Sequence, residues 1–106
     1  MFKEVQPEEA SQLLSQNAAI QFVDVREPHE WAKVHAVGVT LIPLGDLPGR
    51  LDELDKSRPV VAICARGGRS AKACQILESA GFTDVTNVAE GTTGWVEAGL
   101  PTESGG

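Results

Sequence analysis

The longest apolar stretch of the chain runs from Val60 to Ala65. Its first four residues, 60–63, are only Val, Ala and Ile, and a purely apolar strand of this kind is typical of the centre of a parallel sheet that is covered on both faces. The stretch is far shorter than the roughly 20 apolar residues that a membrane-spanning helix needs. We therefore predict a central, buried strand over residues 60–63.

Strand-like and helix-like segments alternate along the rest of the chain. The clearest helix is expected over residues 70–80, where apolar residues recur at helical spacing and Gly81 follows as a C-terminal cap. This alternation is typical of an α/β fold with a mostly parallel, roughly five-stranded sheet flanked by helices. Further strands are predicted over residues 2–5, 20–25, 37–42 and 85–88, helices from Pro7, over 28–33 and over 92–98, and short helical turns over 44–54.

The length and the net charge of the chain limit the number of domains and the classes of ligand. The 106 residues suit one domain, so we expect a single domain over 1–106, with about 102–106 as a flexible tail. The net charge of −6 argues against nucleic acid as a general ligand and against an anionic membrane. We expect a cytoplasmic protein, because the N-terminus shows no apolar export segment. No cluster of His or Cys suggests a metal, and we expect no cofactor.

One segment combines several features that activate a thiol. Cys64 ends the predicted central strand, and it is followed by two glycines and then by the helix over residues 70–80. Glycines let successive N–H groups turn inward as an anion-binding nest, and a helix N-terminus adds unpaired N–H groups. Such surroundings favour the thiolate, so we predict a lowered pKa for Cys64. The loop that would surround the sulfur consists of Ala65, Arg66, Gly67, Gly68, Arg69 and Ser70.

Positive charge is concentrated around the same segment. Residues 56–77 carry five Lys and Arg side chains and no Asp or Glu, although the whole chain is acidic. This distribution suits a small anionic ligand beside Cys64. Two alternatives stay open, namely that Cys64 is an inert core residue and that part of the charge faces away from the loop.

The segment from Cys64 to Ser70 resembles the active-site loop of the rhodanese family of sulfurtransferases, in which four residues separate a Cys from an Arg that is usually followed by Ser or Thr. Four other segments are similar to family motifs and occur in the family's order. They are Asp24 to Trp31, His35 to Val39, Ala80 to Val85 and Glu90 to Trp95. The resemblance covers nearly the whole chain and implies a rhodanese-like three-layer domain.

The length of the loop distinguishes this family from its relatives. Dual-specificity phosphatases and arsenate reductases of related fold have five residues between Cys and Arg, which makes a wider loop. Only four residues separate Cys64 from Arg69, so the resemblance favours sulfur transfer over phosphate or arsenate chemistry. The chain departs from the family at Ala36 and Val37 and at residues 90–92, which we interpret either as packing variation or as an altered substrate rim.

The resemblance implies a two-step transfer. Cys64 takes sulfane sulfur from a small anionic donor such as thiosulfate or a persulfide, and passes it to a thiol, a protein or, in vitro, cyanide. Arg66 is expected to contact the substrate anion and Arg69 to fix the loop. The alternative is a persulfide carrier or partner-binding module with weak turnover. The sequence leaves open whether the protein is a monomer or a homodimer.

Some residues outside the loop have alternative interpretations. Asp24 and Arg26 end a predicted strand, and either one of them braces the loop, for example through Asp24 and Arg69, or the two form a local turn pair. We interpret His35 as structural and His29 as solvated. A structural Cys74 is favoured over a resolving cysteine. Trp31 and Trp95 are expected to pack rather than to stack on a substrate.

Overall fold

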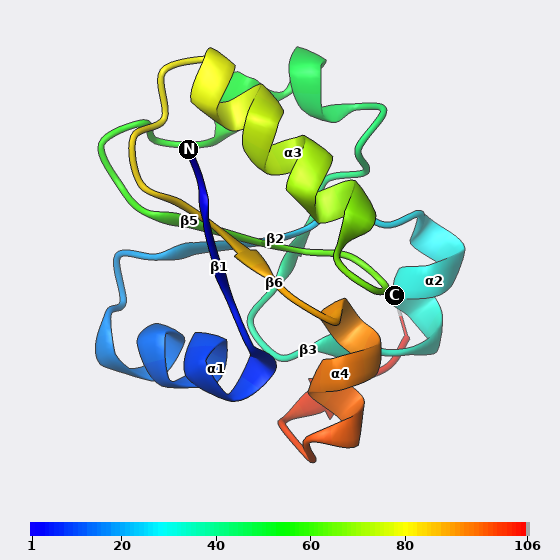
Figure 1. Ribbon diagram of the computed structural model, residues 1–106. Coiled ribbons are helices and arrows are strands. Elements are labelled where there is room, and N and C mark those ends of the chain that lie inside the picture. Colours follow the sequence, from blue (N-terminus) through cyan, green and yellow to red (C-terminus); the bar gives the residue numbers. More distant parts are fainter. Residues whose placement is uncertain (106) are drawn as a thin grey trace.

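The apolar run of the sequence forms strand β5 (Val60–Ile63) in the middle of a five-stranded sheet (Figure 1). The computed structural model describes residues 1–105. All neighbouring strands of this sheet are parallel. Their order is β1 (Lys3–Val5), β6 (Val85–Val88), β5, β2 (Gln21–Asp24) and β4 (Thr40–Leu41).

Alternate residues of β5 belong to two separate hydrophobic clusters, because successive side chains of a strand point to opposite faces. Val60 and Ala62 pack in one cluster with residues of α3 (Gly68–Ser79). Val61 and Ile63 pack in the other with Ala10 of α1 (Pro7–Gln16) and Trp95 of α4 (Gly91–Glu97). The sheet therefore lies between two layers of helices, and the predicted α/β fold with a parallel five-stranded sheet is confirmed (Figure 1).

Most of the elements lie within a residue or two of the predicted ones. Strands β5 and β6 and helix α2 (Pro28–Lys33) have the predicted bounds. Helix α3 begins two residues earlier than predicted, because Gly67 adopts a left-handed φ of 104° as its N-cap. The short helical turns expected over 44–54 are two 3-10 helices, η1 (Leu47–Gly49) and η2 (Leu51–Glu53).

The strand predicted over 37–42 is shorter in the structure, where only β4 (Thr40–Leu41) forms within that range. Gly38, with a positive φ of 86°, lies between β4 and the preceding strand β3 (His35–Ala36), and β3 and β4 belong to different sheets. β3 pairs with β7 (Thr102–Glu103) in an antiparallel two-stranded sheet.

Part of the segment that we expected to be a flexible tail, over about 102–106, is paired with the domain. Its first two residues form β7, and the N–H of Gly105 donates to the carbonyl of Ala32 at 2.7 Å. The chain is therefore tied to the domain beyond residue 101. Gly106 lies outside the described residues.

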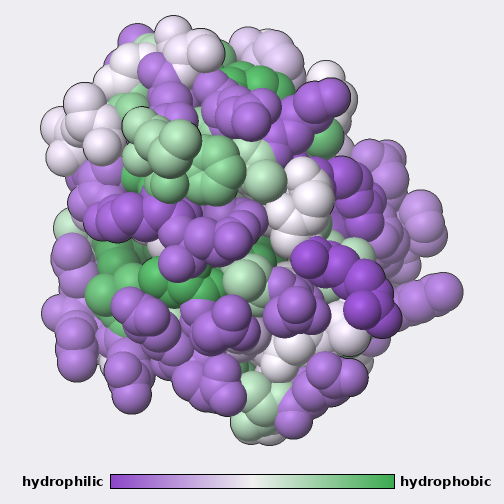
Figure 2. Space-filling view, viewed as in Figure 1, coloured by the Kyte–Doolittle hydropathy of each residue, from purple (hydrophilic) through white to green (hydrophobic). Residues whose placement is uncertain are grey.

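One face of the molecule is largely polar. Figure 2 shows hydrophilic residues over most of the face seen in Figure 1, with smaller hydrophobic areas between them. Among the helices within residues 1–105, none has the length and apolar character that crossing a membrane requires.

Helix α4 is attached directly to the segment that follows β5. The N–H of Thr92 donates to the carbonyl of Cys64 at 2.7 Å, and the N–H of Thr93 donates to that of Ala65 at 3.1 Å. Gly91 begins the helix with a φ of +53°, and a Cβ at this position would overlap the backbone of Cys64 and Ala65. The close approach of the two segments therefore requires glycine.

Gly91→Ala should lower the free energy of unfolding by roughly 3 kcal/mol, because backbone strain and steric overlap add together. Gly99→Ala is the matched control. Gly99 also has a positive φ, of 73°, but its surroundings are open, so only the conformational cost of about 1 kcal/mol is expected. Urea denaturation of both variants measures the difference. Equal losses would show that the approach of α4 to Cys64 is not tight.

Candidate active site

Cys64 lies directly after β5, at the carboxyl edge of the sheet, and is 1% exposed. Two groups of the following segment donate hydrogen bonds to its sulfur. The N–H of Gly67 lies 3.0 Å from Sγ, and Oγ of Ser70 lies 3.2 Å from it. The loop thus curls around the sulfur, and residues 65–70 lie at the edge where ligands of parallel sheets bind.

Burial and hydrogen bonding act in opposite directions on the Cys64 thiol. Burial raises its pKa, whereas the hydroxyl of Ser70 and the backbone of Ser70, Gly67 and Arg66 lower it, and the net effect is a lowered pKa. The direction agrees with the sequence-based expectation. The largest contributions to the lowering are hydrogen bonds.

Arg69 is tied to a helix that is distant in sequence. Its Nη1 and Nη2 donate to Oε1 and Oε2 of Glu30 at 2.7 and 2.8 Å, which is the two-bond geometry that an arginine and a carboxylate favour. The hydrogen bond from Arg69 is the largest cause that lowers the pKa of Glu30 to about 2. This ion pair fastens the loop to α2.

The brace from Asp24 to Arg69 that the sequence suggested is not present. Asp24 instead binds Arg26, whose Nε and Nη2 lie 3.0 and 2.8 Å from its two carboxylate oxygens. The pair is buried, and Nη2 of Arg26 also donates to the carbonyl of Val34 at 2.7 Å. The local turn pair, the other interpretation, is therefore what the structure shows. Through its hydrogen bond to Val34, Arg26 also links the two ends of α2.

The basic stretch of the sequence does not converge on Cys64. Nε of Arg58 donates to the carbonyl of Ala19 at 2.8 Å, at the end of β5 opposite the loop, and Lys56 lies beside Gly81. Arg66 is exposed and, within residues 1–105, forms no ion pair. It is therefore a charged group of the loop that is available to an anion.

Two residues that contact the loop, Asn87 and Glu30, were not among those predicted for the site. Asn87 is completely buried in β6, and its Oδ1 accepts a hydrogen bond from Oγ of Ser70. Its Nδ2 donates to Glu4 Oε2 at 2.9 Å and to the Gly67 carbonyl at 3.1 Å. The sequence held one signal for Asn87, since it is a polar residue within a predicted strand that is otherwise suited to burial. Glu30 gave a weaker one, as an acid within the motif from Asp24 to Trp31.

The other singled-out residues are structural. His35 is buried, stacks on Trp31 with ring centroids 3.6 Å apart, and its Nδ1 lies 2.8 Å from the carbonyl of Trp31. Trp95 packs against Phe22. Burial raises the pKa of Cys74 to about 12, so this thiol stays protonated, in keeping with the structural interpretation. His29 is exposed.

The departure from the family pattern at residues 90–92 is accompanied by backbone strain and, in the part of the chain that the structure describes, by an unpaired hydroxyl. Glu90 has a left-handed φ of 65°, a conformation that favours glycine and that costs another residue about 1–2 kcal/mol. Thr92, two residues later, is buried, and its Oγ1 has no hydrogen-bond partner within residues 1–105. Both residues begin α4, beside the loop.

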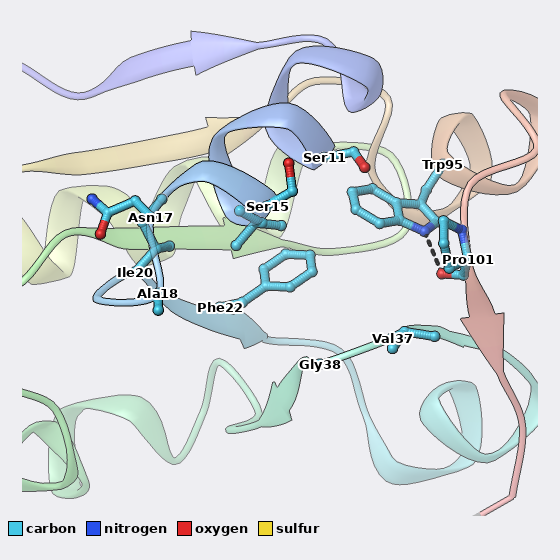
Figure 3. A pocket seen from close by; sticks show the side chains of 11 residues that line it. Ser11, Ser15, Asn17, Ala18, Ile20, Phe22, Val37, Gly38, Trp95 and Pro101 are labelled. Atoms are coloured by element: carbon cyan, nitrogen blue, oxygen red, sulfur yellow. Dashed lines mark hydrogen bonds between the residues drawn. The ribbon is translucent and has the colours of Figure 1, made fainter.

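A hollow of about 350 Å³ lies away from Cys64, between α1, β2 and the segment after α4 (Figure 3). Phe22, Ile20 and Trp95 line it with apolar surface. None of its lining residues belongs to the loop, so it is not part of the site around Cys64. Across residues 1–105, no three His, Cys, Asp or Glu side chains gather as a metal site.

The model of the rhodanese-like domain family matches residues 6–98. The chain belongs to the rhodanese-like family. The expected family is therefore confirmed, and so is its fold. The chain is 29% identical to the rhodanese-like domain of the Alr3790 protein from Anabaena, with a TM-score of 0.88 over 98% of this chain and 80% of that one.

Two curated relatives of this rhodanese-like chain are named for different roles in sulfur chemistry. It is 32% identical to the thiosulfate sulfurtransferase GlpE of Actinobacillus pleuropneumoniae serotype 7, over 97% of this chain and 94% of that protein. It is 35% identical to the putative sulfur carrier protein YrkF of Bacillus subtilis, over 87% of this chain but only 50% of that protein.

Glu30→Gln should lower stability by about 1 kcal/mol at neutral pH, a value that allows for solvent screening of a partly exposed pair. Because the pKa of Glu30 is lowered from 4.5 to about 2, its carboxylate stabilises the fold above pH 4.5 and this contribution is lost as the pH falls towards 2. Urea denaturation at several pH values should therefore show the difference between wild type and variant shrinking in acid.

Glu53→Gln is the matched control, since Glu53 makes a similarly short, two-bond pair with Arg50, and its side chain is 48% exposed against 25% for that of Glu30. A smaller loss is expected there. A Glu30→Gln difference that stays constant from neutral pH into acid would contradict the account of this pair.

Proposed function

We propose that this protein is a sulfurtransferase that carries sulfane sulfur as a persulfide on Cys64. The observation that carries the proposal is the buried sulfur of Cys64, which accepts hydrogen bonds from Gly67 N–H and Ser70 Oγ and has a lowered pKa. The thiolate is the nucleophilic form of cysteine. The name of the GlpE relative supports thiosulfate as a donor.

The chemistry needs no outside oxidant or reductant. The Cys64 thiolate attacks the outer sulfur of thiosulfate, a new S–S bond forms, and the bond inside thiosulfate breaks. Sulfite leaves with the electron pair of that bond, and Cys64 now carries a persulfide whose negative charge lies on the outer sulfur. A thiol, a protein persulfide acceptor or cyanide then attacks this outer sulfur, and the Cys64 thiolate is released. The covalent intermediate splits one transfer into two easier steps.

The loop supplies what this reaction requires. The N–H groups of Gly68, Arg69 and Ser70 are in the first turn of α3, so no carbonyl one turn earlier in the helix accepts from them. They are donors suited to the charge of the outer sulfur. Arg66 attracts the anionic donor, because its charge is exposed and forms no ion pair with any residue from 1 to 105. Arg69 holds the loop through Glu30.

A second function, that of a sulfur carrier, has a specific observation in its favour, the name of the YrkF relative. A carrier would accept the persulfide in the same way but would discharge slowly to small molecules. The two functions share the first step and differ in the second. Phosphate or arsenate chemistry is disfavoured by the four-residue spacing between Cys64 and Arg69.

Exposure to thiosulfate should add about 32 Da, one sulfur atom, to the intact protein as a persulfide. Cys64→Ser should abolish both this adduct and sulfite release. Cys74→Ser should keep both, because its buried thiol stays protonated. Mass spectrometry and a sulfite assay measure the two steps separately.

The outcomes discriminate between the functions. An adduct with rapid discharge to cyanide supports the transferase, and an adduct with poor discharge supports the carrier. Sulfite release that persists in Cys64→Ser would rule out the proposed nucleophile.

A further inference from the structure

The hydroxyl of Ser70 has one hydrogen and two acceptors. Its Oγ lies 3.2 Å from Sγ of Cys64 and is also hydrogen-bonded with Oδ1 of Asn87. All three side chains are buried, with exposures of 0 to 1%. Because a hydroxyl donates only one hydrogen, the two acceptors compete for it.

The orientation of the Asn87 amide follows from its other contacts. Nδ2 faces the carboxylate of Glu4 at 2.9 Å and the carbonyl of Gly67 at 3.1 Å. Both are acceptors, so each takes one of the two amide hydrogens. Oδ1 must then face Ser70. As it can only accept, this contact requires the hydrogen of the Ser70 hydroxyl.

The charge on Sγ decides which acceptor receives that hydrogen. A thiolate is a strong acceptor, whereas the sulfur of a thiol is a weak one. We propose that Asn87 is a positioning residue, which accepts the Ser70 hydrogen bond while Sγ of Cys64 is uncharged and gives it up when Sγ is a thiolate. The same holds for the persulfide, because its charge lies on the outer sulfur and Sγ is again uncharged. This last step rests on the proposed function.

Asn87 thereby keeps a buried hydroxyl paired in every state of the sulfur. Without it, the Ser70 hydroxyl would have Sγ as its one remaining protein acceptor, and an unpaired buried hydroxyl is costly. The thiolate, which accepts most strongly, would then be favoured over the thiol. Truncating a residue that merely supports the loop would act the other way, since a looser loop stabilises the thiolate less.

Other charged and titratable groups surround Cys64 and can also influence its pKa. The first test of the proposal must therefore leave these groups unchanged. The groups come from every element around the site. They are Arg69 and Cys74 of α3, Asp24 and Arg26 at the end of β2, Glu30 of α2, Glu4 of β1, Arg66 of the loop and Glu90 before α4.

The test is a double-mutant cycle on the pKa of Cys64, read from the ultraviolet absorbance of the thiolate against pH. Cys74→Ser serves as the parent, so that only one thiol titrates. Ser70→Ala should raise the pKa. Asn87→Ala should lower it by about 0.5, which is about a threefold change in the ratio of thiolate to thiol. In the Ser70→Ala background, Asn87→Ala should change nothing.

Thr86→Ala is the matched control, because Thr86 is a buried polar neighbour on the same strand and its side chain points to the other face. It should leave the pKa unchanged. An unchanged or raised pKa in Asn87→Ala would overturn the proposal, and so would a lowering that persists without the Ser70 hydroxyl.

Glu4→Gln keeps the proposal testable if Asn87→Ala does not fold, since Glu4 is exposed. It removes the charge that polarises the Asn87 amide and should lower the Cys64 pKa slightly, again only when Ser70 is present. If the charge of Glu4 acted directly on the sulfur, Glu4→Gln would lower the Cys64 pKa in the Ser70→Ala background as well. That result would contradict an effect of Asn87 through the Ser70 hydroxyl. No sulfur donor takes part in these titrations, so their failure is distinct from a failure of the sulfurtransferase proposal.

Discussion

The hydrogen bonds donated to Sγ of Cys64 are the interactions on which this site depends. A thiol that is 1% exposed should resist ionisation, because burial penalises the charged form. Gly67 N–H, Ser70 Oγ and neighbouring backbone groups outweigh that penalty and lower the pKa. The site thus combines a sulfur of lowered pKa with exclusion from solvent, which is the condition under which its hydrogen bonds are strongest.

The fold keeps these donors in place from three sides. Helix α2 holds the loop through Glu30 and Arg69, and α4 holds the carbonyls of Cys64 and Ala65 through the N–H groups at its start. Asn87 of β6 contacts both Ser70 and the Gly67 carbonyl. These three elements come from separate parts of the chain, so the loop is fixed by the domain as a whole rather than by its own sequence.

The sequence predicted the parts of the site that are local. Cys64, the two glycines and the start of α3 are contiguous, and their effect on the thiol follows from backbone geometry. The partner of Arg69 could not be predicted in this way, because Glu30 lies 39 positions away and the pairing depends on how α2 docks. Asn87 is likewise brought to Ser70 only by the pairing of β6 with β5.

The errors in the fold concern short strands. The strand predicted over 37–42 is reduced to β4, because Gly38 has a positive φ. The short strand β7 exists only because β3 pairs with it, and its two residues carry no strand signal of their own. The two buried strands β5 and β6 were predicted with their full bounds.

The pKa of Cys64 in the unmodified protein tests the account most directly. It can be measured as the pH dependence of thiolate absorbance in wild type minus that in Cys64→Ser. The account predicts a midpoint below 9.0, the value of an unperturbed thiol, because the hydrogen bonds from the loop outweigh burial. A midpoint at or above 9.0 would show that burial prevails, and the thiolate proposed as the nucleophile would not be formed at neutral pH.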